Sequence, residues 1–130
     1  MDLFDSFSPQ EGVPIYLQIL RLVKRGIAAG SVEEGTELPS RRALSARLGV
    51  NPNTVQKAYH LLEEEGLISS RSGAKSAVTL PPGAAERIRR ELLEQEAGAL
   101  VRALRQSGLD KQGAVALVER LWETTEEETT

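Results

Sequence analysis

Apolar residues recur at helical spacing in three stretches of the first half of the chain. In the first stretch, Pro14 is placed to open a helix and Gly30 to end it. The apolar residues between them are offset by 4, 7, 8 and 12 positions and share one helix face: Ile15, Ile19, Leu22, Val23 and Ile27. Residues 1–12 lack this pattern and are expected to form an irregular arm.

A second, short helix is predicted directly after Pro39. Ser40 suits its N-cap, because the hydroxyl can accept a hydrogen bond from an early backbone N–H. Gly49 is expected to end this helix. Three residues are expected to form its buried side: Ala43, Leu44 and Leu48.

The third helix is predicted to begin almost at once. Asn51 supplies a capping side chain, Pro52 fits the first helical position, and Gly66 closes the helix. Its apolar residues again fall on one face: Val55, Ala58, Tyr59, Leu62 and Leu67. Two such helices joined by a tight turn form a helix-turn-helix pattern.

After Gly66 the pattern changes from helical to strand-like. Residues 67–71 and 76–80 are each typical of a short strand, and a turn-rich segment separates them, so a β-hairpin is expected. A hairpin in this place is a wing, and residues 13–80 are predicted to form one winged helix-turn-helix domain. Pro81, Pro82 and Gly83 make the clearest break, and 81–83 is expected to be a linker.

Residues 84–130 are predicted to form a tail of two amphipathic helices. In residues 84–106, apolar residues alternate four and three positions apart: Leu93, Ala97, Leu100 and Leu104. After Asp110 a second stripe follows: Ala114, Leu117, Val118, Leu121 and Trp122. The acidic residues 124–130 are expected to fray. The predicted fold class is mainly α with a small β-hairpin (α+β), a winged helix-turn-helix domain followed by a two-helix tail.

Charge is unevenly distributed along the chain. Residues 1–82 hold nine basic and nine acidic side chains, so the net charge of −3 arises entirely beyond them. Between Pro39 and Lys75, six basic side chains face only three glutamates, at 63–65. These glutamates are expected to be a solvated helix end facing away from any polyanion. Charges act over about 8 Å at physiological salt, so this segment can meet a phosphate despite the acidic total.

The residue inventory argues against an enzyme or a metal protein. The chain has no cysteine and a single histidine, His60, which is expected to be exposed or packed. Walker and dinucleotide-binding glycine motifs are absent. No apolar run approaches the roughly 18 residues that span a bilayer, and the first residues do not form a secretory signal. We therefore expect a cytoplasmic protein without catalysis, metal or cofactor.

Several spaced motifs resemble the head of the GntR family of bacterial regulators. They lie, in the family's order, at residues 14–19, 35–45, 48–59 and 62–68. The sequence Asn51-Pro52-Asn53-Thr54-Val55 and the short tail resemble the YtrA-like subfamily in particular. The resemblance implies a transcription regulator whose partner is a double-stranded DNA operator.

This resemblance also implies which residues meet DNA. The third helix would enter the major groove, where Asn and Gln can bond to adenine and a Thr methyl can touch thymine. Arg42 matches the family's groove-reaching arginine, whereas Arg41 departs from the family pattern and is expected either to contact a phosphate or to be solvated. Asn51 and Thr54 can serve the helix cap, the DNA, or both. The candidate DNA contacts are Ser40, Arg41, Arg42, Asn51, Pro52, Asn53, Thr54, Gln56, Lys57, Arg71, Ser72, Gly73 and Lys75.

The apolar stripes of the tail need to be covered by other apolar groups. Tyr59 in the third helix and Trp122 in the tail are expected to be core residues rather than platforms on which bases stack. Two helices cannot easily enclose a small-molecule pocket of about 300 Å³, so a second copy is the simplest cover. The expected homodimer interface comprises Leu93, Ala97, Leu100, Leu104, Leu117, Leu121 and Trp122.

The leading hypothesis is therefore a dimeric repressor that binds an inverted-repeat operator. The subfamily resemblance implies an operator near transporter genes, and whether a small-molecule effector acts is left open. The alternative is a winged-helix module that binds another protein and has no direct contact with DNA.

Overall fold

The chain divides into two compact units, and the division falls between Leu92 and Leu93. The computed structural model describes the backbone of residues 3–70 and 75–129, and the side chains of these residues except 125–129. The expected linker at 81–83 is therefore not where the two units separate. The start of the first tail helix belongs to the head.

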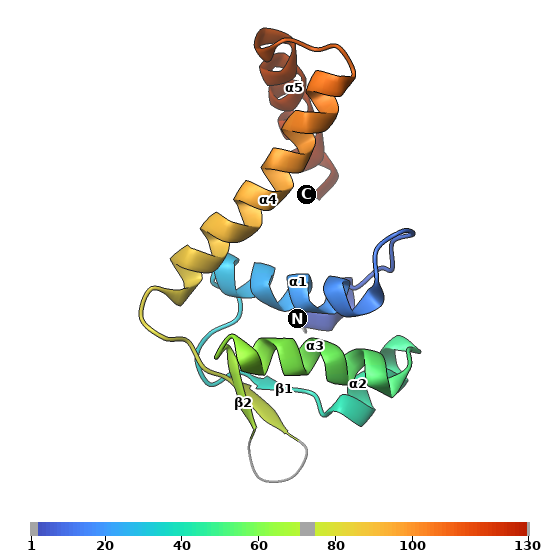
Figure 1. The fold of residues 1–130 in the computed structure, drawn as a ribbon, viewed down its shortest axis with the longest axis vertical. Coiled ribbons are helices and arrows are strands. Elements are labelled where there is room, and N and C mark those ends of the chain that lie inside the picture. Colours follow the sequence, from blue (N-terminus) through green and yellow to red (C-terminus); the bar gives the residue numbers. More distant parts are fainter. Residues whose placement is uncertain (1–2, 71–74, 130) are drawn as a thin grey trace. The chain divides into compact units, whose positions relative to one another are not determined.

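We call the first unit, residues 1–92, the head, and the second unit, residues 93–130, the tail. The head includes α1 (Ile15–Ala29), α2 (Arg41–Leu48), α3 (Pro52–Glu64) and a small sheet (Figure 1). Helices α1 and α3 pack side by side, and α2 packs against α3. This arrangement, followed by two C-terminal helices, confirms the predicted fold class. The elements are η1 (Leu3–Ser6), α1 (Ile15–Ala29), β1 (Glu37–Leu38), α2 (Arg41–Leu48), α3 (Pro52–Glu64), β2 (Ile68–Ser70), β3 (Ser76–Val78), α4 (Ala84–Gln106) and α5 (Lys111–Thr129).

The predicted helix caps of α2 and α3 are confirmed. The Ser40 hydroxyl accepts a hydrogen bond from the Ala43 N–H at 3.1 Å, and the Asn51 side chain accepts one from the Asn53 N–H at 2.8 Å. Each bond satisfies a backbone donor that has no partner within its helix. The prediction that Ala43 is buried was wrong, because its position on α2 turns it to solvent.

The sheet has one strand more than the hairpin predicted from the sequence. Its order is β1-β3-β2 and both pairings are antiparallel, with Leu38 opposite Ser76 and Ile68 opposite Val78. Strand β1 is two residues long, too short for its side chains to show an alternating pattern. It connects the start of α2 to the base of the wing.

The N-terminal arm is irregular only in part, because residues 7–12 form no helix or strand, whereas the segment before them is helical. Residues Leu3–Ser6 form a 3-10 helix, and Phe4 is buried in the core with 3% of its surface exposed. Asp5 forms an ion pair with Arg47 on α2. A single buried aromatic residue without a periodic pattern around it carries no sequence signal, which explains the error.

The first turns of α4 pack against the head near the C-terminal end of α1. Ala84, Ile88 and Leu92 are buried, and the Arg89 guanidinium donates two hydrogen bonds to the Ala28 carbonyl, at 2.7 and 3.2 Å. The guanidinium thereby caps carbonyl groups at the C-terminal end of α1, where a cation is favourable. These contacts explain why the units divide after Leu92.

Helix α5 continues to Thr129, so the acidic residues that were expected to fray are helical up to that residue.

None of the helices in the described part of the chain combines the length and the apolar character of a membrane span.

Phe4→Ala is expected to lower the free energy of unfolding by about 3 kcal/mol, because it leaves a cavity in the head core. Urea denaturation followed by circular dichroism measures the change. Phe7→Ala, at a half-buried position, is the matched control and should cost clearly less. Equal, small losses in both variants would show that the N-terminal segment contributes nothing to the core.

Candidate nucleic-acid interface

The turn between α2 and α3 sets the direction of α3. Gly49 has a φ of 69°, a left-handed conformation that glycine adopts without steric cost. The buried Ser45 hydroxyl donates a hydrogen bond to the Val50 carbonyl at 2.7 Å, and the Gly49 and Val50 N–H groups both donate to the Ser45 carbonyl. Sequence reasoning missed Ser45, although its place beside Leu44 on the buried side of α2 was a signal.

Helix α3 has two contrasting faces. Val55, Ala58, Tyr59 and Leu62 are fully buried against the rest of the head. Their burial turns the polar residues of the first turns outward, and the structure gathers all six candidates from this helix start there. Thr54 is half-buried and the other five are exposed: Asn51, Pro52, Asn53, Gln56 and Lys57.

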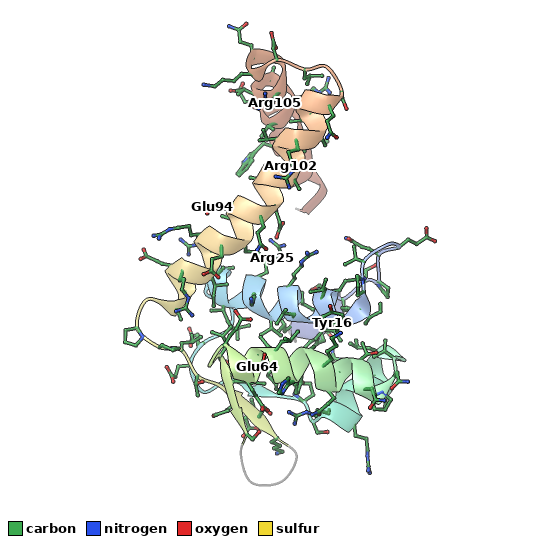
Figure 2. All side chains as sticks on the ribbon, viewed as in Figure 1. Tyr16, Arg25, Glu64, Glu94, Arg102 and Arg105 are labelled. Atoms are coloured by element: carbon green, nitrogen blue, oxygen red, sulfur yellow. The ribbon has the colours of Figure 1, made fainter. Side chains whose placement is uncertain are left out.

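One of these exposed residues has an aromatic partner. The Lys57 ammonium lies 4.0 Å from the centre of the Tyr16 ring, a cation–π contact. Tyr16 points from α1 toward α3 in Figure 2. Tyr16 was not among the sequence candidates, because no local pattern connects residues 41 positions apart. The contact holds the cation in place at the edge of the polar face.

Three candidates lie at the start of α2. Ser40 caps the helix and is half-buried, and Arg42 is exposed. Arg41 is not simply solvated, because its cation has partners within the head, and a phosphate contact by Arg41 stays a prediction. Its Nη2 lies 2.7 Å from a carboxylate oxygen of Glu63, and its guanidinium lies 5.2 Å from the centre of the Tyr59 ring.

The three glutamates at the end of α3 also differ from expectation. Glu64 is solvated, as predicted, and lies 2.9 Å from exposed His60 (Figure 2). Glu65 instead forms an ion pair with Lys24 at 2.8 Å, and Glu63 pairs with Arg41. The acidic cluster therefore binds cations of the head rather than only facing water. Among the described side chains, those of residues 3–70 and 75–124, no three of His, Cys, Asp or Glu gather as a metal site.

The wing contributes one described candidate. Lys75 is exposed just before β3, on the turn side of the hairpin. The other three candidates of the wing, Arg71, Ser72 and Gly73, lie outside the described residues. The described interface is therefore the exposed face formed by Arg42, the start of α3 and Lys75.

Comparison with known proteins identifies the family of this chain. The model of the gntR family of bacterial regulatory proteins matches residues 15–78. The chain is 33% identical over 119 residues to the HTH-type transcriptional repressor YtrA of Bacillus subtilis, and the match covers 92% of this chain and 87% of the relative. The chain belongs to the GntR family. It is a helix-turn-helix transcription regulator that binds DNA, and it is not an enzyme.

Solved structures resemble this GntR-family chain over most of its length. A GntR-family regulator from Listeria monocytogenes is 29% identical with a TM-score of 0.75, and the match covers 86% of this chain and 98% of that one. YtrA from Sulfolobus acidocaldarius is 32% identical with a TM-score of 0.52, and the match covers 68% and 92%. Membership of a family of DNA-binding regulators favours the operator hypothesis over the protein-interaction alternative.

Asn51→Ala is expected to lower the free energy of unfolding by about 1 kcal/mol, because the Asn53 N–H loses its acceptor. Asn51→Asp retains an acceptor and should stay close to the original stability. Thermal or urea unfolding measures both. Asn53→Ala leaves the cap in place and is the control, expected to change stability by less than about 0.5 kcal/mol. An equal loss in Asn51→Asp would contradict the capping role.

Proposed function

We propose that this GntR-family regulator is a homodimeric repressor of an inverted-repeat operator. The observation that carries the proposal is the contrast between the two faces of α3, one fully buried and the other polar and exposed. A helix held this way can lie in the major groove with its first residues at the base edges.

The chemistry of the exposed residues suits base and phosphate contact. Asn53 and Gln56 carry amides that match the donor and acceptor pattern of adenine, and Arg42 can bond to guanine in a bidentate manner. Lys57 and Lys75 are exposed cations suited to phosphate oxygens. The wing candidates Arg71, Ser72 and Gly73 would extend the contact along the duplex.

The repressor assignment rests on the relative from Bacillus subtilis, which is named a transcriptional repressor and matches nearly the whole chain. A bound dimer would compete with polymerase for a promoter. The subfamily resemblance favours an operator near transporter genes.

The tail unit leaves a broad apolar surface uncovered. Trp122, expected in a core, has 67% of its surface exposed. A groove of about 670 Å³ lies between the two tail helices, and it is lined mainly by apolar side chains together with four charged residues, Arg105, Asp110, Lys111 and Glu119. The large exposed apolar residues of this unit are Leu93, Leu100, Val101, Leu109, Val115, Val118, Leu121 and Trp122.

A second copy of the tail is the proposed cover for this surface. Exposed apolar patches of this kind commonly mark protein interfaces. A two-fold dimer buries the same patch on both chains, and two heads related by that axis would read inverted half-sites. Of the expected interface residues, Ala97 is exposed with the large residues above, whereas Leu104 and Leu117 are half-buried within the tail.

Arg42→Ala is expected to weaken binding to a selected operator by about 1–3 kcal/mol and to relax sequence preference. Fluorescence anisotropy with operator and scrambled duplexes measures both effects. Arg21→Ala, which removes an exposed cation from α1, is the matched control and should change operator affinity little. An equal loss on both duplexes would show that Arg42 only positions the protein.

Leu100→Glu is expected to convert the dimer into a monomer, because it places a charge on the apolar surface of the tail. Sedimentation velocity measures the mass, and affinity for a full operator should fall by about 100-fold. The fluorescence of Trp122, the single tryptophan, should shift to the red as the interface opens. Gln95→Glu adds the same charge at a polar exposed position and should remain dimeric. A Leu100→Glu dimer would refute the tail interface.

A further inference from the structure

One carboxylate oxygen of Glu63 is shared by two other elements of the head. Its Oε1 accepts a hydrogen bond from Arg41 Nη2 at 2.7 Å and another from the Ser70 hydroxyl at 3.1 Å. Arg41 is the first residue of α2, and Ser70 is the last residue of β2. Glu63 itself lies in the last turn of α3. The Glu63 side chain thus connects α3 with α2 and with strand β2 of the wing.

The Arg41 side chain is held inward by more than this ion pair. Only 26% of the Arg41 side chain and 32% of the Glu63 side chain are exposed. The guanidinium also lies over Tyr59, whose hydroxyl donates a hydrogen bond to the Pro39 carbonyl at 2.7 Å. The Arg41 Nε is buried and has no hydrogen-bond partner among the described residues. A partly buried cation needs a nearby negative charge, and Glu63 supplies it.

Arg42 presents the opposite case at the next position. Successive helix positions differ by about 100°, so when one arginine turns inward its neighbour is directed elsewhere. Arg42 is exposed. The two consecutive arginines are therefore suited to different tasks, one to an internal ion pair and the other to the duplex.

Ser70 places the third element. It lies opposite Ser76 in the antiparallel pairing of β2 with β3, at the end of the pairing nearest the hairpin turn. A hydrogen bond from Ser70 to Glu63 therefore holds the end of β2 nearest the hairpin turn against α3.

We propose that Glu63 is a positioning residue for DNA recognition, which fixes α2 and the wing relative to α3 and withholds the Arg41 cation from the phosphates. The inference rests on the proposed DNA interface. Glu63 touches no DNA in this proposal and acts through Arg41 and Ser70.

The first experiment compares Arg41 with a proposed phosphate contact, Lys75, by salt dependence. A duplex selected by the protein and a scrambled duplex are titrated across salt concentrations with the full chain. Each phosphate neutralised contributes about −0.9 to the slope of log affinity against log salt. Lys75→Gln, which removes an exposed cation proposed to meet a phosphate, should flatten the slope by about 0.9 per head. Arg41→Gln should leave the slope unchanged while lowering selected-duplex affinity by about 5- to 10-fold. A slope flattened equally in both variants would overturn the proposal.

The second experiment tests Glu63 against its neighbour. Glu63→Gln should lower the preference for the selected over the scrambled duplex by about 5- to 10-fold. It should also steepen the slope by up to about 0.9 per head, because the released Arg41 can reach a phosphate. The double variant Arg41→Gln with Glu63→Gln should regain the original slope but not the preference. Glu64→Gln removes the same charge from a solvated residue and is the control. Identical behaviour of Glu63→Gln and Glu64→Gln would overturn the positioning role.

A measurement without DNA separates this inference from the proposed function. Amide hydrogen exchange at Ser69 and Ala77, which lie opposite each other in the pairing of β2 with β3, should be faster in Glu63→Gln than in Glu64→Gln, with α1 unchanged in both. Equal exchange at these amides would overturn the inference about Glu63. Failure of the original protein to prefer any duplex would instead overturn the proposed function.

Discussion

Burial of one face of α3 is the constraint on which the rest of the head depends. Val55, Ala58, Tyr59 and Leu62 have no exposed surface, so the helix cannot rotate about its axis without exposing apolar area. The residues between them are consequently fixed on the outer side. The polar character of that outer side is a property of the helix as a whole, because the buried residues decide which others remain available to a partner.

Local patterns predicted the main helices, the caps of α2 and α3 and the exposed polar side of α3, whereas the contacts between distant residues were not predicted. A cap such as Ser40 or Asn51 acts within three residues, and the helical period repeats within four, so both can be read from a short window. The pairs that escaped prediction join distant positions. Arg41 and Glu63 are 22 residues apart, and Arg89 and Ala28 are 61 apart. Such pairs depend on the tertiary fold, and the residues that flank them in the sequence do not predict them.

A chain with a net negative charge can bind DNA when its positive charges lie on the surface that the duplex approaches. The total of −3 counts every charged group equally, whereas a phosphate meets only the charges near the surface it approaches. Lys24 and Arg41 are already matched with Glu65 and Glu63, so the acidic cluster and its cations largely cancel. Among the described residues of the proposed interface, Arg42, Lys57 and Lys75 are exposed and would supply the positive charge that a duplex meets.

The hydrogen bonds from Arg89 to the Ala28 carbonyl at the end of α1 limit where the head can be joined to the tail of another regulator. Because Ala84 and Ile88 are core residues of the head, its boundary as an exchangeable module lies inside a helix and not at the proline-rich break before it. A chimera that grafts a different tail onto this head would have to keep the helix through Leu92 and make its junction beyond that residue.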